Sequence, residues 1–177
     1  MKFIRLMSIA AIVLTVAMLA VPAKADPITF TAKLTGAQEN PGTNSTATGF
    51  GTIVLNGNQA TITLSFSGVM TGAVAAHIHQ PTAFGLNGSV IIPFDGLFTV
   101  GATSSSFTTT VTLTASQITA LNAGLLYFNV HSTSLMGGEI RGNISAAVPE
   151  PATLVLLGTG LLSIAGAAKR RRKNNSE

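Results

Sequence analysis

The fold of this chain is decided by the stretch Ala75-Ala76-His77-Ile78-His79, which holds two of the three histidines among 177 residues. Side chains of a β-strand point alternately to opposite faces, so a strand here directs His77 and His79 to one side and Ile78 to the other. The apolar side must face a core. We therefore predict a strand that turns both imidazoles outward.

The same alternation recurs in two later runs, Tyr127-Phe128-Asn129-Val130-His131 and Gly138-Glu139-Ile140-Arg141-Gly142. If the apolar members of each run face the core, His131 points outward in the first run, and Glu139 and Arg141 point outward in the second. The sequence thus predicts that the polar side chains of three strands share one outer surface. On such a surface, Glu139 and Arg141 would form an exposed ion pair.

The rest of the middle segment carries further strand signals and one helix signal. Asn56-Gly57 predicts a tight hairpin turn, because both residues tolerate positive φ. Thr114 and Gln117 form a capping-box pattern for a short helix that stops at Gly124. The predicted strands cover residues 28–35, 50–55, 60–66, 74–79, 89–94, 107–113, 125–131 and 138–144. About eight short strands without a repeating βα pattern predict an all-β fold, an antiparallel Greek-key-like β-sandwich or flattened barrel with one short helix.

Both ends of the chain are typical of targeting segments. Residues 1–25 begin with two bases, continue with an apolar run and end with Ala23-Lys24-Ala25, as secretory signal peptides do. We predict cleavage after Ala25 by signal peptidase. The folded domain would then span residues 26–147, followed by a C-terminal segment at 148–177.

The C-terminal segment combines a Pro-Glu-Pro motif, seventeen uncharged residues at 152–168 and a basic cluster. A helix over 152–168 would be about 25 Å long, enough for a thin bilayer, with the basic cluster in the cytoplasm. These features resemble the PEP-CTERM sorting signal of exported bacterial proteins. The resemblance implies removal of the tail by an exosortase, whereas the residues alone also permit a permanent membrane anchor. The residues that carry the motif are Pro149, Glu150, Pro151, Arg170, Arg171 and Arg172.

The basic character of the chain belongs to these ends. Between residues 26 and 147 there are two bases, Lys33 and Arg141, and four acidic residues, so the formal charge of the domain is −2. Nucleic-acid binding needs clustered bases on the folded surface, and this class is excluded. The chain has no cysteine, which excludes disulfides and thiolate metal sites.

Four blocks of the domain, taken in order, resemble the CHRD domain, which was first named from chordin and occurs in bacterial exported proteins. The blocks are Gly36-Ala37-Gln38-Glu39, Ala76-His77-Ile78-His79, Tyr127-Phe128-Asn129-Val130-His131 and Gly138-Glu139-Ile140-Arg141-Gly142. The resemblance covers nearly all of residues 28–145. It implies an exported module but no settled enzymatic activity, and no residue role follows from it.

The histidines admit two interpretations. His77 and His79 lie about 7 Å apart along a strand, and together with His131 they could supply the three nitrogens that copper or zinc prefers. The arrangement is similar to the copper site of Cu/Zn superoxide dismutases, although this chain has no fourth ligand histidine and no cysteine. Alternatively, the rings hydrogen-bond with Glu139, Asn129 or backbone carbonyls and so hold neighbouring strands together. In the metal-binding interpretation, Glu139, with Arg141 beside it, would accept a hydrogen bond from a histidine ring nitrogen and so orient the ring toward the ion.

Two functions follow from these observations. The first is an exported surface or matrix module that binds a partner, such as exopolysaccharide or a surface protein, without catalysis. The second is a copper- or zinc-dependent oxidoreductase related to superoxide dismutase that uses His77, His79 and His131. Metal content and a superoxide assay would separate them.

Overall fold

The computed structural model describes residues 26–147. They form nine strands, one 3-10 turn and one α-helix, confirming the predicted order of strands and the position of the helix. The elements are β1 (Ile28–Thr35), η1 (Gly36–Gln38), β2 (Thr48–Asn56), β3 (Gln59–Ser67), β4 (Ala73–Gln80), β5 (Ser89–Pro93), β6 (Ser105–Thr112), α2 (Ala115–Asn122), β7 (Tyr127–Ser132), β8 (Ile140–Asn143) and β9 (Ser145–Ala146).

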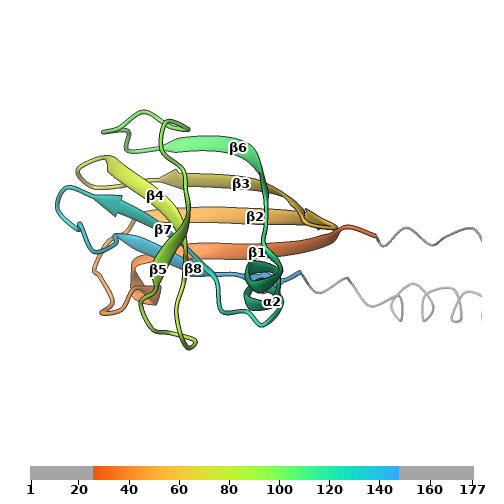
Figure 1. Ribbon diagram of the computed structural model, residues 1–177. Coiled ribbons are helices and arrows are strands. Elements are labelled where there is room, and N and C mark those ends of the chain that lie inside the picture. The colour runs from red at the N-terminus through yellow and green to blue at the C-terminus, as the bar shows by residue number, and fades with distance from the viewer. Residues whose placement is uncertain (1–25, 148–177) are drawn as a thin grey trace, which may run out of the picture. The chain divides into compact units, whose positions relative to one another are not determined.

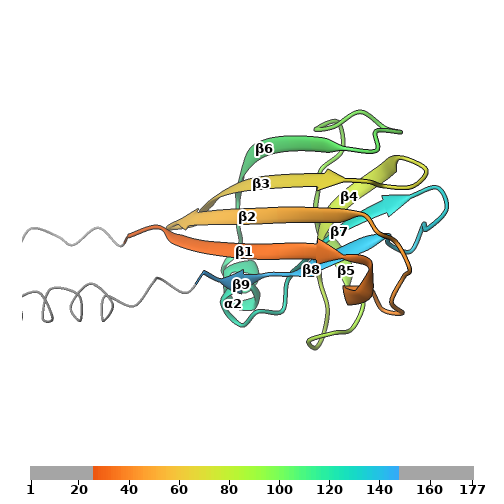
Figure 2. The ribbon, with the colours of Figure 1, turned by 180° about the vertical axis from the view of Figure 1, so that it is seen from behind.

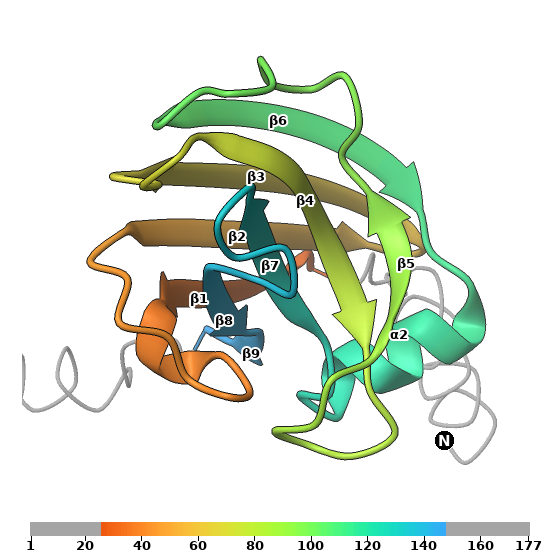
Figure 3. The ribbon, with the colours of Figure 1, turned by 90° about the vertical axis from the view of Figure 1, so that its left-hand side faces the viewer.

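The strands form one antiparallel sheet in the order β5-β4-β7-β8-β1-β2-β3-β6, and the two-residue β9 pairs with β1. Figures 1 and 2 show the sheet from its two sides, and Figure 3 shows that it curls until β4, β5 and β7 face β2, β3 and β6. The predicted all-β antiparallel fold, a flattened barrel with one helix, is confirmed.

The core lies between the two halves of the curled sheet, as the alternation of apolar residues requires. Ile78, Val130 and Ile140 are completely buried, which confirms the strand registers predicted for the three polar runs. The two halves come close together at Gly51 of β2 and Phe128 of β7. A Cβ on Gly51 would lie 2.4 Å from the ring of Phe128, so only glycine fits there.

The turn between β2 and β3 differs by one residue from the predicted one. Asn56 pairs with Gln59, so the two turn residues are Gly57 and Asn58 instead of Asn56 and Gly57. Gly57 has φ +62°, and no non-glycine residue has positive φ in residues 26–147. Only the first of the two turn residues has positive φ, a conformation that glycine adopts more readily than asparagine. The position of Gly57 therefore sets the register of the hairpin.

The helix α2 begins and ends as the sequence predicts. The Thr114 side chain accepts a hydrogen bond from the Gln117 backbone, and the Gln117 side chain accepts one from the Thr114 backbone, which completes the capping box. Gly124 follows the helix with φ +68°. The helix links β6 to β7, and through them the two halves of the curled sheet (Figure 3).

The two edge strands of the sheet, β5 and β6, are not paired with each other in the described part of the chain. Aromatic side chains pack across this seam instead. The ring of Phe94, just after β5, lies 5.2 Å from that of Phe107 in β6, and Phe98 lies 6.1 Å from Phe107. The curled sheet is therefore closed on this side by apolar contact between β5 and β6, together with backbone hydrogen bonds between Ala73 of β4 and residues 101 and 102 ahead of β6.

Within residues 26–147, no helix has the length and apolarity needed to cross a bilayer. The predicted signal peptide at 1–25 and the C-terminal segment at 148–177 lie outside the described residues.

Candidate metal centre and its surroundings

The three histidines converge, as the alternation patterns predict. His77 and His79 come from β4 and His131 from β7, two neighbouring strands in which Ala75 pairs with His131 and His77 with Asn129. One ring nitrogen from each histidine lies within 4.8 Å of those of the other two. The ring centroids are 5.0 to 5.8 Å apart. The three rings are close enough to share one ion.

The surface that carries the histidines is buried, and the prediction of an exposed polar face is wrong. His79 and His131 are 7% and 8% exposed, and only His77 is half-buried. Segments 36–47, 81–88 and 133–139 fold over this side of the sheet. The tips of the first two are joined by hydrogen bonds from Asn40 Nδ2 to Gly85 O and from Asn87 Nδ2 to Asn40 O. The alternation gives the direction of each side chain but not what covers it.

Backbone carbonyls fix the orientation of two of the rings. His79 Nδ1 lies 2.9 Å from Gly88 O, and His131 Nδ1 lies 3.0 Å from Met136 O. Because a carbonyl only accepts, each Nδ1 carries the proton and donates it. In the neutral rings each Nε2 is then left with a free lone pair. The Nε2 of His79 is buried without a hydrogen-bond partner among the described residues.

The third ring completes the cluster through its other nitrogen. His77 Nδ1 lies 3.2 Å from His131 Nε2. Since His131 Nε2 is unprotonated, His77 donates this hydrogen bond. Moving that proton to His77 Nε2 would free the lone pair of His77 Nδ1 in addition to those of His79 Nε2 and His131 Nε2. The arrangement thus provides one Nδ1 and two Nε2 atoms as nitrogen ligands.

Behind His79 lies a stack of three planar groups. The Tyr127 ring is parallel to the His79 ring, with an interplanar angle of 4° and centroids 4.9 Å apart. The Arg141 guanidinium lies 3.5 Å from the Tyr127 ring centroid, as in a cation–π contact. The Tyr127 hydroxyl accepts from Gly88 N at 3.0 Å, so Gly88 contacts Tyr127 through its N–H and His79 through its carbonyl.

Glu139 does not form the predicted contacts. It is completely buried, and its Oε1 accepts hydrogen bonds from Ser45 Oγ at 2.7 Å and from Met70 N at 3.0 Å. Arg141, 1% exposed, donates to Leu86 O, Asn87 Oδ1 and Asn143 Oδ1. The predicted exposed ion pair between Glu139 and Arg141 is therefore wrong. The ring nitrogens are oriented by carbonyl oxygens instead of a carboxylate.

Comparison with known proteins identifies the family to which the four sequence blocks belong. A family model of the CHRD domain matches residues 30–144. This chain belongs to the CHRD family. A second model, the PEP-CTERM protein-sorting motif, matches residues 147–173. No curated protein and no solved structure matches the chain.

Both sequence resemblances are thereby confirmed. The sorting motif identifies the protein as one exported to the cell envelope and processed by an exosortase. The similarity of the histidines to those of superoxide dismutases remains a prediction.

The surroundings of the CHRD histidines keep them uncharged. Burial lowers the pKa of all three rings, opposed at His79 and His131 by the carbonyls that accept from Nδ1, and the pKa of His131 falls to about 4. At neutral pH the rings are therefore neutral. Imidazole binds metal ions in this form.

One polar residue of the CHRD site, Glu39, received no role from the sequence. It follows η1 and is 8% exposed beneath the loops. Burial raises the pKa of its carboxyl to about 7, against the lowering effects of Arg141 and Asn129. Glu39 belongs to the sequence block Gly36-Ala37-Gln38-Glu39, which could have pointed to it. A single acidic residue in a polar loop is normally solvated, so the sequence did not predict its burial.

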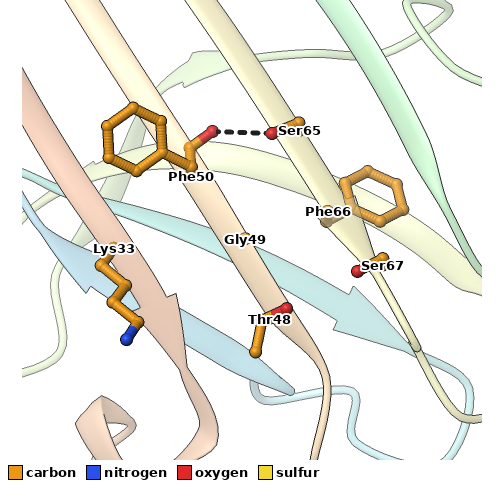
Figure 4. Close-up of a pocket in the computed structure, with 7 residues that line it drawn as sticks. All are labelled: Lys33, Thr48, Gly49, Phe50, Ser65, Phe66 and Ser67. Carbon is orange, nitrogen blue, oxygen red and sulfur yellow. Dashed lines mark hydrogen bonds between the residues drawn. The ribbon is translucent and has the colours of Figure 1, made fainter.

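The other half of the CHRD sheet carries a shallow hollow that is separate from the histidines. It has a volume of about 420 Å³ and is lined by residues of β1, β2 and the end of β3. Figure 4 shows Phe50 and Lys33 at this hollow, with Ser65 Oγ donating to the carbonyl of Phe50. Phe50 is half exposed. The hollow holds one charged residue, and none of its lining atoms is a buried polar group without a partner in the described range.

Proposed function

We propose that this protein is an exported envelope module that binds one copper or zinc ion through His77, His79 and His131. The observation that carries the proposal is the convergence of one nitrogen from each ring within 4.8 Å. Two of these rings are already held in the required tautomer by Gly88 O and Met136 O. Ligand histidines in metal sites usually donate their other N–H to an acceptor in this way.

One of the three spacings already suits a tetrahedral ion, and the others, within 4.8 Å, would have to shorten on binding. Zinc–nitrogen bonds of about 2.0 to 2.1 Å at tetrahedral angles place two ligand nitrogens about 3.4 Å apart. His77 Nδ1 and His131 Nε2 are 3.2 Å apart. Three nitrogen ligands leave a fourth position, and His77, the most exposed of the three, lies on the side from which a water or partner group would reach it.

Copper and zinc are favoured over harder ions by the donor set. The three atoms are imidazole nitrogens, which suit copper and zinc, whereas calcium and magnesium select oxygen ligands. The superoxide dismutase alternative requires a redox-active copper and remains a prediction. The geometry of the three rings favours metal binding, but it does not specify a reaction.

Metal analysis of the exported protein tests the proposal. We expect one copper or zinc ion per chain after dialysis and loss of binding in His77→Ala, His79→Ala and His131→Ala. Changing a residue behind a ligand costs about 10- to 100-fold in affinity, so removing a ligand should cost at least roughly 100-fold. Thr108→Ala, on an exposed position of β6, is the control. Equal metal content in all four variants would refute the site.

The fate of the tail is a second part of the proposal. We infer that cleavage after the Pro-Glu-Pro motif releases the domain to the cell surface or matrix, where it acts as a binding or structural module. Intact-mass analysis of protein recovered from its host decides this. A mature form that still carries Arg170, Arg171 and Arg172 would show a permanent anchor instead.

A further inference from the structure

We propose that Asp95 is a positioning residue of the metal site, whose carboxylate accepts a hydrogen bond from a water molecule on the fourth position of the ion and offsets part of the charge of the ion. The inference deepens the function proposed above and rests on it. Asp95 lies just after β5, the strand that flanks β4 on the side away from β7.

The pairing of β4 with β5 places Asp95 beside His77. His77 pairs with Pro93, and the ladder continues one residue beyond β5, where Phe94 N donates to Ala76 O at 3.1 Å. Phe94 is completely buried, so the next residue, Asp95, begins on the opposite side, which carries His77. Residues related diagonally across an antiparallel pair, as His77 and Asp95 are, have Cα atoms about 7–8 Å apart.

Asp95 is the carboxylate on the open side of the histidine cluster. Its side chain is exposed, and His77 beside it is the most exposed of the three rings. Burial lowers the pKa of His77, and the negative charge of Asp95 opposes this effect. The other described acids lie elsewhere, because Glu39 and Glu139 are buried and Asp26 precedes β1.

A divalent ion held by the three rings would be short of negative charge without Asp95. Neutral imidazoles bring none to the site. The Arg141 guanidinium, which lies over the Tyr127 ring behind His79, adds a positive charge on the inner side. Because the Coulomb energy grows with the product of the charges, one carboxylate on the open side stabilises a divalent ion more than a monovalent one.

The carboxylate acts through the fourth ligand and is not itself a ligand. The atoms that lie within 4.8 Å of one another belong to the three histidines, and Asp95 is outside this group. A water molecule spans a gap of this kind between polar groups. Water bound to zinc is strongly polarised and donates readily, and carboxylates around metal sites commonly accept hydrogen bonds from the ligands.

The test compares the exported protein with Asp95→Asn, Asp95→Glu and Asp26→Asn in competition titrations with zinc and, under reducing conditions, with cuprous copper. We expect Asp95→Asn to weaken zinc binding about 10- to 100-fold and cuprous binding by a smaller factor, with Asp95→Glu restoring most of the zinc affinity. The visible spectrum of the cobalt-substituted protein should change in Asp95→Asn. Asp26→Asn removes an exposed charge before β1, at the opposite end of that strand from segment 36–47, and is the matched control.

Two results would overturn the inference and leave the metal proposal intact. One is the same zinc affinity in the wild type, Asp95→Asn and Asp26→Asn, together with loss of binding in His77→Ala. The other is an equal loss of zinc and cuprous affinity in Asp95→Asn, which would show that Asp95 supports the shape of the site and not the charge of the ion. If the wild-type protein binds neither metal, the metal proposal and the role of Asp95 both fail.

Discussion

Replacing His131 by glutamine should make the domain markedly less sensitive to acid. In the folded protein burial lowers the pKa of His131 from 6.5 to about 4, whereas in the unfolded chain the ring takes up a proton at its ordinary pKa. Below about pH 6.5 the unfolded state therefore binds more protons than the native state. The stability associated with the neutral ring is complete above that pH and is lost as the pH falls toward 4.

The size of the effect follows from the two pKa values. A change from 6.5 to about 4 corresponds to about 3 kcal/mol, at 1.36 kcal/mol for each pKa unit. Glutamine has no proton to gain, and its amide can still donate to Met136 O. The free energy of unfolding of His131→Gln should therefore fall by about 3 kcal/mol less than that of the wild type between about pH 7 and pH 4.

Urea denaturation at a series of pH values, with a chelator present throughout, measures this difference. His77→Gln is the control, because His77 is the most exposed of the three rings and should show a smaller effect. Parallel curves for the wild type and His131→Gln would refute the assignment of a buried neutral ring at this position.

Three further predictions test other parts of the structure. Glu39→Gln should act in the opposite direction. The native state keeps the Glu39 proton up to about pH 7, so wild-type stability falls as the pH rises through this value. In urea denaturation the free energy of unfolding of the variant should fall by about 1 to 2 kcal/mol less than that of the wild type between about pH 5 and pH 8. Gly51→Ala places a methyl group against Phe128 and should cost about 1 to 3 kcal/mol, while Gly137→Ala, with open space around it, should be nearly neutral; equal thermal melting of the two would contradict the close packing of the sheet halves. Arg141→Lys loses the planar contact with Tyr127 and the bonds to Asn143, and should weaken zinc binding roughly ten-fold in competition titrations. Unchanged affinity would show that the stack does not hold His79.

Much of the fold could be predicted because its information is local. Alternation fixed the inward direction of Ile78, Val130 and Ile140, and a strand cannot slip by one residue without burying the opposite set of side chains. The capping box at Thr114 is also a pattern of neighbouring residues. Alternation also placed the three histidines on one face, whereas their closeness depends on the pairing of β4 with β7, which alternation does not determine.

What the sequence did not reveal depends on loops. The burial of Glu139 and Arg141 arises because segments 36–47 and 81–88 fold over the sheet, and nothing in their composition indicates this. The donors to Glu139 are a hydroxyl of Ser45 and a backbone amide of Met70, both far from it in the chain. The carbonyls that orient the histidines belong to Gly88 and Met136, and backbone atoms leave no trace in a sequence.

The aromatic seam between β5 and β6 has a consequence for how the domain moves. Elsewhere the curled sheet is held by ladders of backbone hydrogen bonds, which must break together for neighbouring strands to part. Along β5 and β6 themselves the contacts of Phe94, Phe98 and Phe107 oppose separation, and these weaken gradually with distance. Among residues 26–147, backbone hydrogen bonds join the two sides only at one end of the seam, between Ala73 of β4 and residues 101 and 102 ahead of β6. The two edge strands can therefore separate transiently while the rest of the sheet stays intact. Outward-facing amides of β5 and β6 should exchange with solvent long before those of β1 and β2 in the middle of the sheet.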